Sequence, residues 1–144
     1  MADGLKFNVD GSARGKPGPA GIGGVLRISD GKILCLFSTY VGIKDSNTAE
    51  ILALHRACDL CSSNASLKGR DVVFASDSKT EVSWVNNTSS IGSFKHVNLI
   101  YEIRSFLYYS GTLVVVHNHR STHSLADVLA KAGSNSCGNR TEWG

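Results

Sequence analysis

The order of apolar segments along the chain predicts an α/β fold, a five-stranded mixed sheet flanked by helices. Three segments with strand character come first, and two more follow, each after a helical segment. These five segments cover residues 5–10, 21–28, 33–40, 72–75 and 113–116. The turn Ser29-Asp30-Gly31-Lys32 joins the second segment to the third as a hairpin. We therefore expect three antiparallel strands followed by two parallel ones, with helices on both faces.

Apolar residues at helical spacing predict four helices between and after these strands. Either Ser46 or Asn47 can cap the first helix. Its apolar stripe is predicted at Ala49, Leu52, Ala53, Ala57, Leu60 and Cys61. Ser124 is expected to cap the last helix. The three later helices are expected over residues 79–85, 97–107 and 125–133.

The composition is that of an ordinary globular protein, with 42% hydrophobic and 19% charged residues. The 144 residues fit one domain, residues 1–144, that can bury a core of its own. No apolar run is long enough to span a bilayer, and residues 1–4 lack an apolar signal-peptide segment. We therefore expect an intracellular monomer without membrane contact. The net charge of +3 is compatible with a polyanionic partner but does not require one.

The cysteines predict packing rather than chemistry. Cys58 and Cys61 have the spacing of a redox or zinc pair, but the sequence offers no second pair in a suitable place. Both also fall on the apolar stripe of the first helix, so we expect reduced thiols in the core. The glycine-rich loop at residues 13–20 lacks the Gly-Lys-Ser/Thr ending of a phosphate-binding loop, and no helix follows it. A small-molecule cofactor is therefore not expected.

Four carboxylates stand where strands end or helices begin: Asp10, Glu50, Asp77 and Asp127. Asp10 is expected at the exit of the first strand, followed by a turn at Gly11, and Asp77 follows the fourth strand. Glu50 and Asp127 fall in the first turns of helices, where the helix dipole favours acidic residues. Each has a purely structural alternative as a turn, a cap or a dipole partner.

If the two strand exits are neighbours, the two helix starts can bring four carboxylates together. Such a group would be self-repelling unless divalent cations neutralised it. Hard oxygen ligands favour Mg²⁺ or Mn²⁺ over zinc. Two such ions, held about 4 Å apart, would clamp a phosphodiester, one activating water and the other stabilising the leaving oxygen. The spacing makes this convergence possible but does not prove it.

Four ordered motifs resemble ribonuclease H type 1, in particular its plant reverse-transcriptase-like branch, which is found also in retroelements. They are Asn8-Val9-Asp10-Gly11-Ser12, Asn47-Thr48-Ala49-Glu50, Ala75-Ser76-Asp77-Ser78 and Ala126-Asp127-Val128-Leu129-Ala130-Lys131. The resemblance covers about residues 5–133. It implies an endonuclease that hydrolyses the RNA strand of RNA–DNA hybrids with two Mg²⁺ ions, for which Mn²⁺ can substitute. It assigns metal binding and catalysis to the four carboxylates named above.

The resemblance also implies substrate contacts. Gly11 and Ser12 would meet the RNA strand through their backbone, Asn47 the base edges or sugars, and Ser78 the DNA strand. Backbone groups that read a 2′-hydroxyl would make the site require RNA on the cut strand. The rest of the duplex would be recognised by groove shape and phosphate contacts.

The loop after the fifth strand departs from the family pattern. His117 stands where many relatives place a mobile histidine that helps product leave, and Arg120 where others use an arginine. His123 replaces an asparagine that is common four residues before the last aspartate. His117, His119 and His123 could alternatively bind zinc or be solvated loop residues. We expect a role in catalysis for His117 and in substrate binding for Arg120.

A second departure from the family pattern concerns substrate binding. Some relatives carry a basic, tryptophan-bearing projection, whereas residues 86–98 offer only Lys95 and His96, with Trp84 just before them. We expect weak, salt-sensitive binding, because fewer phosphate contacts release fewer counterions. This leaves two alternatives open: a catalytically weak or inactive module that binds nucleic acid or protein, and a nuclease for another structure such as a DNA junction.

Overall fold

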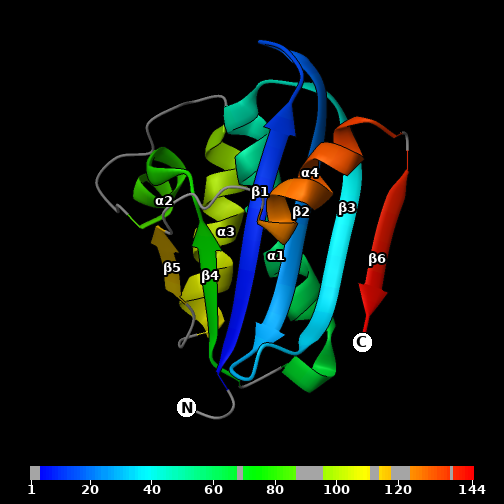
Figure 1. The fold of residues 1–144 in the computed structure, drawn as a ribbon. Helices are drawn as coiled ribbons and strands as arrows, with labels where there is room; N and C mark the ends of the chain where they lie inside the picture. Colours follow the sequence, from blue (N-terminus) through cyan, green and yellow to red (C-terminus); the bar gives the residue numbers. More distant parts are fainter. Residues whose placement is uncertain (1–3, 68–69, 87–95, 111–113, 118–123, 137) are drawn as a thin grey trace.

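The computed structural model describes residues 4–67, 70–86, 96–110, 114–117, 124–136 and 138–144. A six-stranded sheet forms its centre, in the order β5-β4-β1-β2-β3-β6 (Figure 1). The strands are β1 Leu5–Ala13, β2 Gly18–Ile28, β3 Ile33–Lys44, β4 Val72–Ser76, β5 Val114–His117 and β6 Asn139–Trp143. β1 pairs antiparallel with β2 and parallel with β4, and β4 pairs parallel with β5. The predicted mixed α/β sheet is confirmed.

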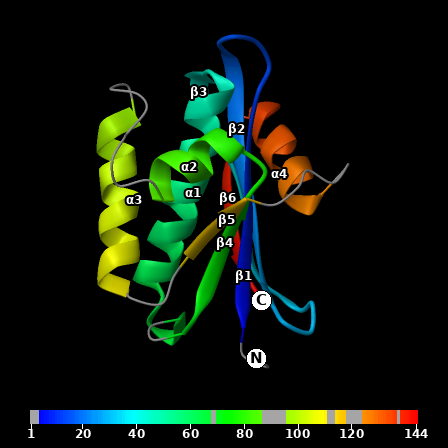
Figure 2. The same cartoon turned by 90° about the vertical axis from the view of Figure 1, so that its left-hand side faces the viewer.

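Helices cover both faces of this sheet, as predicted. They are α1 Ser46–Ser63, α2 Lys79–Asn86, α3 Val97–Ser110 and α4 Leu125–Ser134, with a short 3₁₀ helix at Ala65–Leu67. Figure 2 shows α1, α2 and α3 on one side of the sheet and α4 on the other. Among the described residues, none of these helices is both long and apolar enough to cross a bilayer.

The prediction of five strands was wrong, because β6 adds a sixth strand beside β3. Its sequence, Asn-Arg-Thr-Glu-Trp, is largely exposed and has no alternation of apolar and polar residues. The strand exists because it pairs antiparallel with β3, from Cys35↔Trp143 to Thr39↔Asn139. Long-range pairing of this kind gives no local pattern in the sequence.

β1 is longer than predicted, and this corrects the position of Asp10. The strand runs to Ala13, so Asp10 lies within it and Gly11 does not make a turn. Pairing with β2 continues to Ala13↔Ala20, whereas pairing with β4 ends at Val9↔Ser76. Asp10 is therefore the first residue of β1 beyond the end of β4. β2 correspondingly begins at Gly18, which reduces the predicted loop to residues 14–17.

The cap of the first helix also differs from the prediction. Asp45, rather than Ser46 or Asn47, is the N-cap of α1, and its carboxylate accepts a hydrogen bond from the Thr48 amide at 2.7 Å. The prediction for the last helix is confirmed, since the Asp127 amide donates to the Ser124 hydroxyl at 3.2 Å. Both caps satisfy amides that have no partner inside the helix.

The main core lies between the sheet and the helices α1 and α3. Three fully buried phenylalanines dominate it: the Phe7 ring lies 5.9 Å from that of Phe37 and 6.1 Å from that of Phe74, centroid to centroid. Cys58 and Cys61 are buried in the same core, which confirms the prediction that they pack there. Burial raises the pKa of the Cys61 thiol to about 12, with a smaller contribution from Cys35.

Candidate active site

The structure brings three of the four predicted carboxylates together. Asp10 of β1, Glu50 of α1 and Asp77, which follows β4, each place one carboxylate oxygen within 4.8 Å of the other two. Asp10 is buried, whereas Glu50 and Asp77 are partly exposed. We call these three residues the carboxylate triad.

The register of the sheet places Asp10 beside Asp77. Val9 pairs with Ser76 at the end of the parallel ladder between β1 and β4, so the next residue on each strand is one of the two aspartates. The turn after β4 is shaped by the Ser78 amide, which donates to the Ser76 hydroxyl at 3.1 Å. Asp10 accepts a hydrogen bond from the Gly11 amide at 3.0 Å. The sheet itself thus positions two of the three carboxylates.

Gly11 brings the third carboxylate into place. A Cβ atom at this position would lie 2.3 Å from the Ala49 carbonyl carbon and 2.4 Å from the Glu50 amide nitrogen. Real Cβ atoms do not approach backbone atoms so closely, so a side chain here would push α1 away from β1. The glycine therefore serves close approach rather than a turn, and that approach holds Glu50 next to Asp10.

Three carboxylates within this distance repel one another in the absence of a cation. Their carboxylate oxygens suit hard divalent cations such as Mg²⁺ and Mn²⁺, which proteins bind mainly through carboxylates and water. The donor set includes no thiolate or imidazole from the described residues, which disfavours a zinc site at the triad.

Asp127 is not one of the three residues whose carboxylate oxygens lie within 4.8 Å of one another. It is in the first turn of α4 with its side chain 10% exposed, and its carboxylate is 3.1 Å from the ammonium nitrogen of Lys131, one turn further along. The cross-strand partner of Asp10 is Gly23, which faces α4. Asp10 therefore points toward the same face of the sheet as the helix that carries Asp127.

α4 is docked on the sheet through backbone contacts. A Cβ atom on Gly21 would lie 2.3 Å from the Ala130 carbonyl oxygen, and one on Gly23 would lie 2.5 Å from the Ala130 amide nitrogen. On the adjacent strand, the Ser38 hydroxyl donates to the Leu129 carbonyl at 2.7 Å. These contacts fix the backbone of the helix against β2 and β3.

One buried contact at this end of the molecule was not predicted. The Thr48 hydroxyl and the Nε2 atom of His96 are hydrogen-bonded at 2.7 Å, and both residues are buried. Thr48 is two residues before Glu50, so this bond ties the start of α3 to the turn of α1 that carries the carboxylate. The sequence presents His96 as a surface cation beside Lys95. Only its contact with a residue 48 positions away reveals its burial.

The other predicted site residues are placed as follows. Ser12 and Ser78 are partly exposed, and Asn47 is exposed in the first turn of α1. The backbone of His117 ends β5 and pairs with Ser76, one residue before Asp77. Arg120, His119 and His123 lie outside the described residues.

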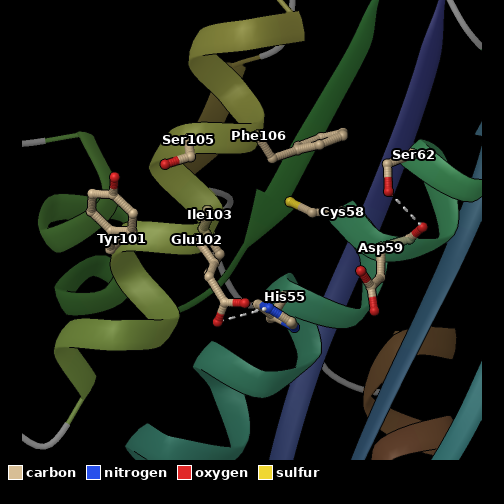
Figure 3. A pocket seen from close by; sticks show the side chains of 9 residues that line it. All are labelled: His55, Cys58, Asp59, Ser62, Tyr101, Glu102, Ile103, Ser105 and Phe106. Carbon is tan, nitrogen blue, oxygen red and sulfur yellow. Dashed lines mark hydrogen bonds and ion pairs between the residues drawn. The ribbon is translucent and has the colours of Figure 1, made fainter.

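A separate hollow of about 290 Å³ lies between α1 and α3 (Figure 3). The ring of His55 and the carboxylate of Glu102 meet at its edge, with Nε2 and Oε2 3.5 Å apart. Cys58 on α1 and Phe106 on α3 extend into the space between the helices. None of the residues predicted for the active site lines this hollow.

A central mixed sheet covered on both faces, with acidic residues where β1 and β4 part, defines an RNase H-like fold. A family model described as reverse transcriptase-like matches residues 8–133. The chain belongs to this family, and the resemblance to ribonuclease H type 1 is confirmed. A comparison with curated protein sequences found no match.

Solved structures agree with this assignment. LC11-RNase H1, isolated from compost by a metagenomic approach, is 31% identical with a TM-score of 0.84, over 94% of this chain and 97% of that one. The same enzyme in complex with an RNA/DNA hybrid gives 30% identity and a TM-score of 0.82, covering 91% and 96%. RNase H1 from Halobacterium salinarum NRC-1 is 25% identical with a TM-score of 0.81, covering 92% and 98%.

Proposed function

We propose that this protein is an endonuclease that hydrolyses the RNA strand of RNA–DNA hybrids, leaving a 5′-phosphate and a 3′-hydroxyl. The observation that carries the proposal is the carboxylate triad, with Asp10, Glu50 and Asp77 placing oxygens within 4.8 Å of one another. It is supported by the likeness to LC11-RNase H1, a structure of which contains an RNA/DNA hybrid.

The triad would hold Mg²⁺, with Mn²⁺ as a substitute. Two ions would supply Lewis-acid activation of the attacking water and charge stabilisation at the leaving oxygen. Asp10 is the most buried member, with 4% exposure, so it is suited to hold its ligand oxygens rigidly. Asp127 is the fourth proposed ligand. Its Oδ2 atom is paired with the ammonium nitrogen of Lys131 at 3.1 Å.

The substrate contacts are proposed from the positions of the residues around the triad. The backbone of Gly11 and Ser12 continues β1 past Asp10, where it can meet the strand that is cut. Asn47 and Ser78 flank Glu50 and Asp77, so their polar side chains can contact the two strands of a hybrid. His117 and Arg120 remain predictions, for product release and phosphate binding. So do the plant retroelement branch, the monomeric state, the single domain and an intracellular location.

The proposal is tested with end-labelled hybrid and an Asp10→Asn variant. The change keeps the volume of the side chain but removes its charge, and we expect cleavage to fall by at least about a hundredfold while the fold is kept. Asp71→Asn is the matched control, because the Asp71 side chain is exposed and the residue contributes to the fold through its backbone: its carbonyl accepts a hydrogen bond from the Leu5 amide at 3.3 Å. Equal cleavage by the Asp10 variant would refute the metal-site assignment.

A second candidate is an RNase H-like module that binds a hybrid without cutting it. The observation that favours it is the pairing of Asp127 with Lys131 outside the triad. Such a module would bind the hybrid with similar affinity in EDTA and in Mg²⁺ and would leave the RNA intact. The enzyme would cut it in Mg²⁺ alone.

A further inference from the structure

Lys131 places a positive charge beside Asp127, the carboxylate that we propose as the fourth metal ligand. Its ammonium nitrogen is 3.1 Å from Oδ2 of Asp127, and the two residues are four apart on α4. The two side chains differ sharply in burial: that of Asp127 is 10% exposed and that of Lys131 is 59% exposed. The pair is thus a fixed, buried carboxylate held by a long side chain that reaches in from solvent.

The helix that carries both residues is docked closely on the sheet. Gly21 and Gly23 of β2 leave only enough room for the backbone of α4, and Gly133 lies as closely against Thr39, where a Cβ atom would be 2.7 Å from the carbonyl oxygen. The Ser124 cap fixes the first turn of the helix as well. With the helix backbone docked in this way, the Asp127 carboxylate can adjust its position by rotation of its side chain.

We propose that Lys131 is a built-in counter-ion that holds Asp127 in the metal-free protein and lowers the affinity of the site for divalent cations. This inference rests on the proposed function and deepens it. The ammonium group competes with a cation for the Asp127 carboxylate, and it also repels the incoming charge.

The exposure of Lys131 makes the counter-ion releasable. A buried lysine would lose its hydration permanently and would need Asp127 to stay charged beside it. A lysine whose side chain is more than half exposed keeps most of its hydration, so it can swing into solvent at little cost once a cation takes its place. An ion pair of this kind contributes little to stability, which suits a contact that must open.

The test is calorimetric titration of MgCl₂, and separately of MnCl₂, into the protein without nucleic acid. The variants are Lys131→Met, Lys131→Arg, Asp127→Asn, the double variant Asp127→Asn with Lys131→Met, and Lys32→Met. Lys32 is an exposed residue of the hairpin between β2 and β3, so its replacement removes the same charge far along the sheet. Circular dichroism checks that each variant is folded.

We expect Lys131→Met to bind cations about three- to tenfold more tightly than the parent, a range typical of removing one nearby, partly screened charge. Lys131→Arg and Lys32→Met should match the parent. In the Asp127→Asn background, Lys131→Met should have a much smaller effect, because the carboxylate that the lysine restrains is gone. In EDTA, Lys131→Met should lower the melting temperature by about 1–2 °C, since an intrahelical ion pair is lost.

Unchanged or weaker cation binding by folded Lys131→Met, with normal binding by the parent, would overturn the inference and leave the proposed function standing. The inference would also be overturned if Lys131→Met raised cation affinity equally in the parent and in the Asp127→Asn background. The lysine would then act on the cation as a positive charge alone, without restraining Asp127. If the parent itself bound neither cation, the metal site and thus the proposed function would fail.

Discussion

The two faces of the sheet use opposite kinds of contact. Under α1 and α3 the sheet presents large side chains, with Phe7, Phe37 and Phe74 fully buried. Under α4 it presents Gly21 and Gly23, which leave space only for a helix backbone. The first face buries apolar area, which stabilises the fold. The second fixes the distance from the sheet of α4, the helix that carries Asp127.

The carboxylate triad combines residues from both faces of the sheet. Asp10 points toward the α4 face, as its partner Gly23 does, whereas Glu50 belongs to α1 on the opposite side. On the α1 side of the sheet, Gly11 has the same role as Gly21 and Gly23 on the α4 side. It allows the backbone of a helix to approach the backbone of a strand closely. Close approach at Gly11, Gly21 and Gly23 thus places the helices that carry Glu50 and Asp127, and large side chains form the core.

The largest effect on stability is expected from a substitution in the core under α1 and α3. Phe7→Ala removes a fully buried ring that contacts two others, so unfolding should become easier by about 3–5 kcal/mol. Denaturant titration measures this. Val128→Ala is the control on α4, where the side chain is 49% exposed and a change within about 0.5 kcal/mol is expected. Similar losses for both variants would remove the distinction between the faces.

Gly11→Ala should affect the active site more than the stability of the protein. The new methyl group would displace the backbone of α1 at Ala49 and Glu50, and a misplacement of this kind can reduce cleavage about a hundredfold. Unfolding should become easier by about 1–3 kcal/mol. Gly138→Ala is the control, since the nearest atom to its Cβ would be the Ser136 hydroxyl at 3.7 Å. Full activity in the Gly11 variant would show that close approach does not position Glu50.

Gly23→Ala probes the other face. Its methyl group would lie 2.5 Å from the Ala130 amide nitrogen, so α4 must lift from β2 and the free energy of unfolding should fall by about 1–3 kcal/mol. Hydrogen exchange should increase in α4 more than in α1. An equal increase in both helices would mean that the glycine contacts stabilise the whole fold rather than dock one helix.

The smallest effect is expected from Cys61, whose thiol is buried in the core under α1 and α3. Burial raises the pKa of Cys61 from 9.0 to about 12, so the folded protein retains this proton more strongly than the unfolded chain does. Its contribution to stability is complete below pH 9 and is lost as the pH rises toward 12. Between pH 8 and pH 10.5, Cys61→Ala should therefore lose less stability than the parent. An identical loss in denaturant titrations would contradict the assigned cause.

The sequence predicted what local patterns determine. The apolar run 72–75 and the Ser124 cap are short-range features, and both appear as expected. Asp45, Ser46 and Asn47 are three successive residues that can cap a helix, so the sequence cannot choose among them. β6 was missed because a polar, exposed strand is specified only by its partner β3.

The same distinction between local patterns and long-range contacts applies to the candidate active site. The motifs around Asp10, Glu50 and Asp77 predicted residues that do lie together, because strand register and the Gly11 contact follow from the fold. The pairing of Asp127 with Lys131 depends on side-chain rotation, which a motif does not encode. The contact between His96 and Thr48 joins two distant segments, so no local pattern could predict it.

Cleavage of three end-labelled duplexes by the unmodified protein tests the central claim most directly. RNA–DNA hybrid, duplex RNA and duplex DNA are compared in Mg²⁺, in Mn²⁺ and in EDTA, and the product ends are identified. We predict cutting of the RNA strand of the hybrid alone, in either metal and not in EDTA, with 5′-phosphate and 3′-hydroxyl ends. A folded protein that cuts none of the duplexes, or that cuts DNA, would contradict the account.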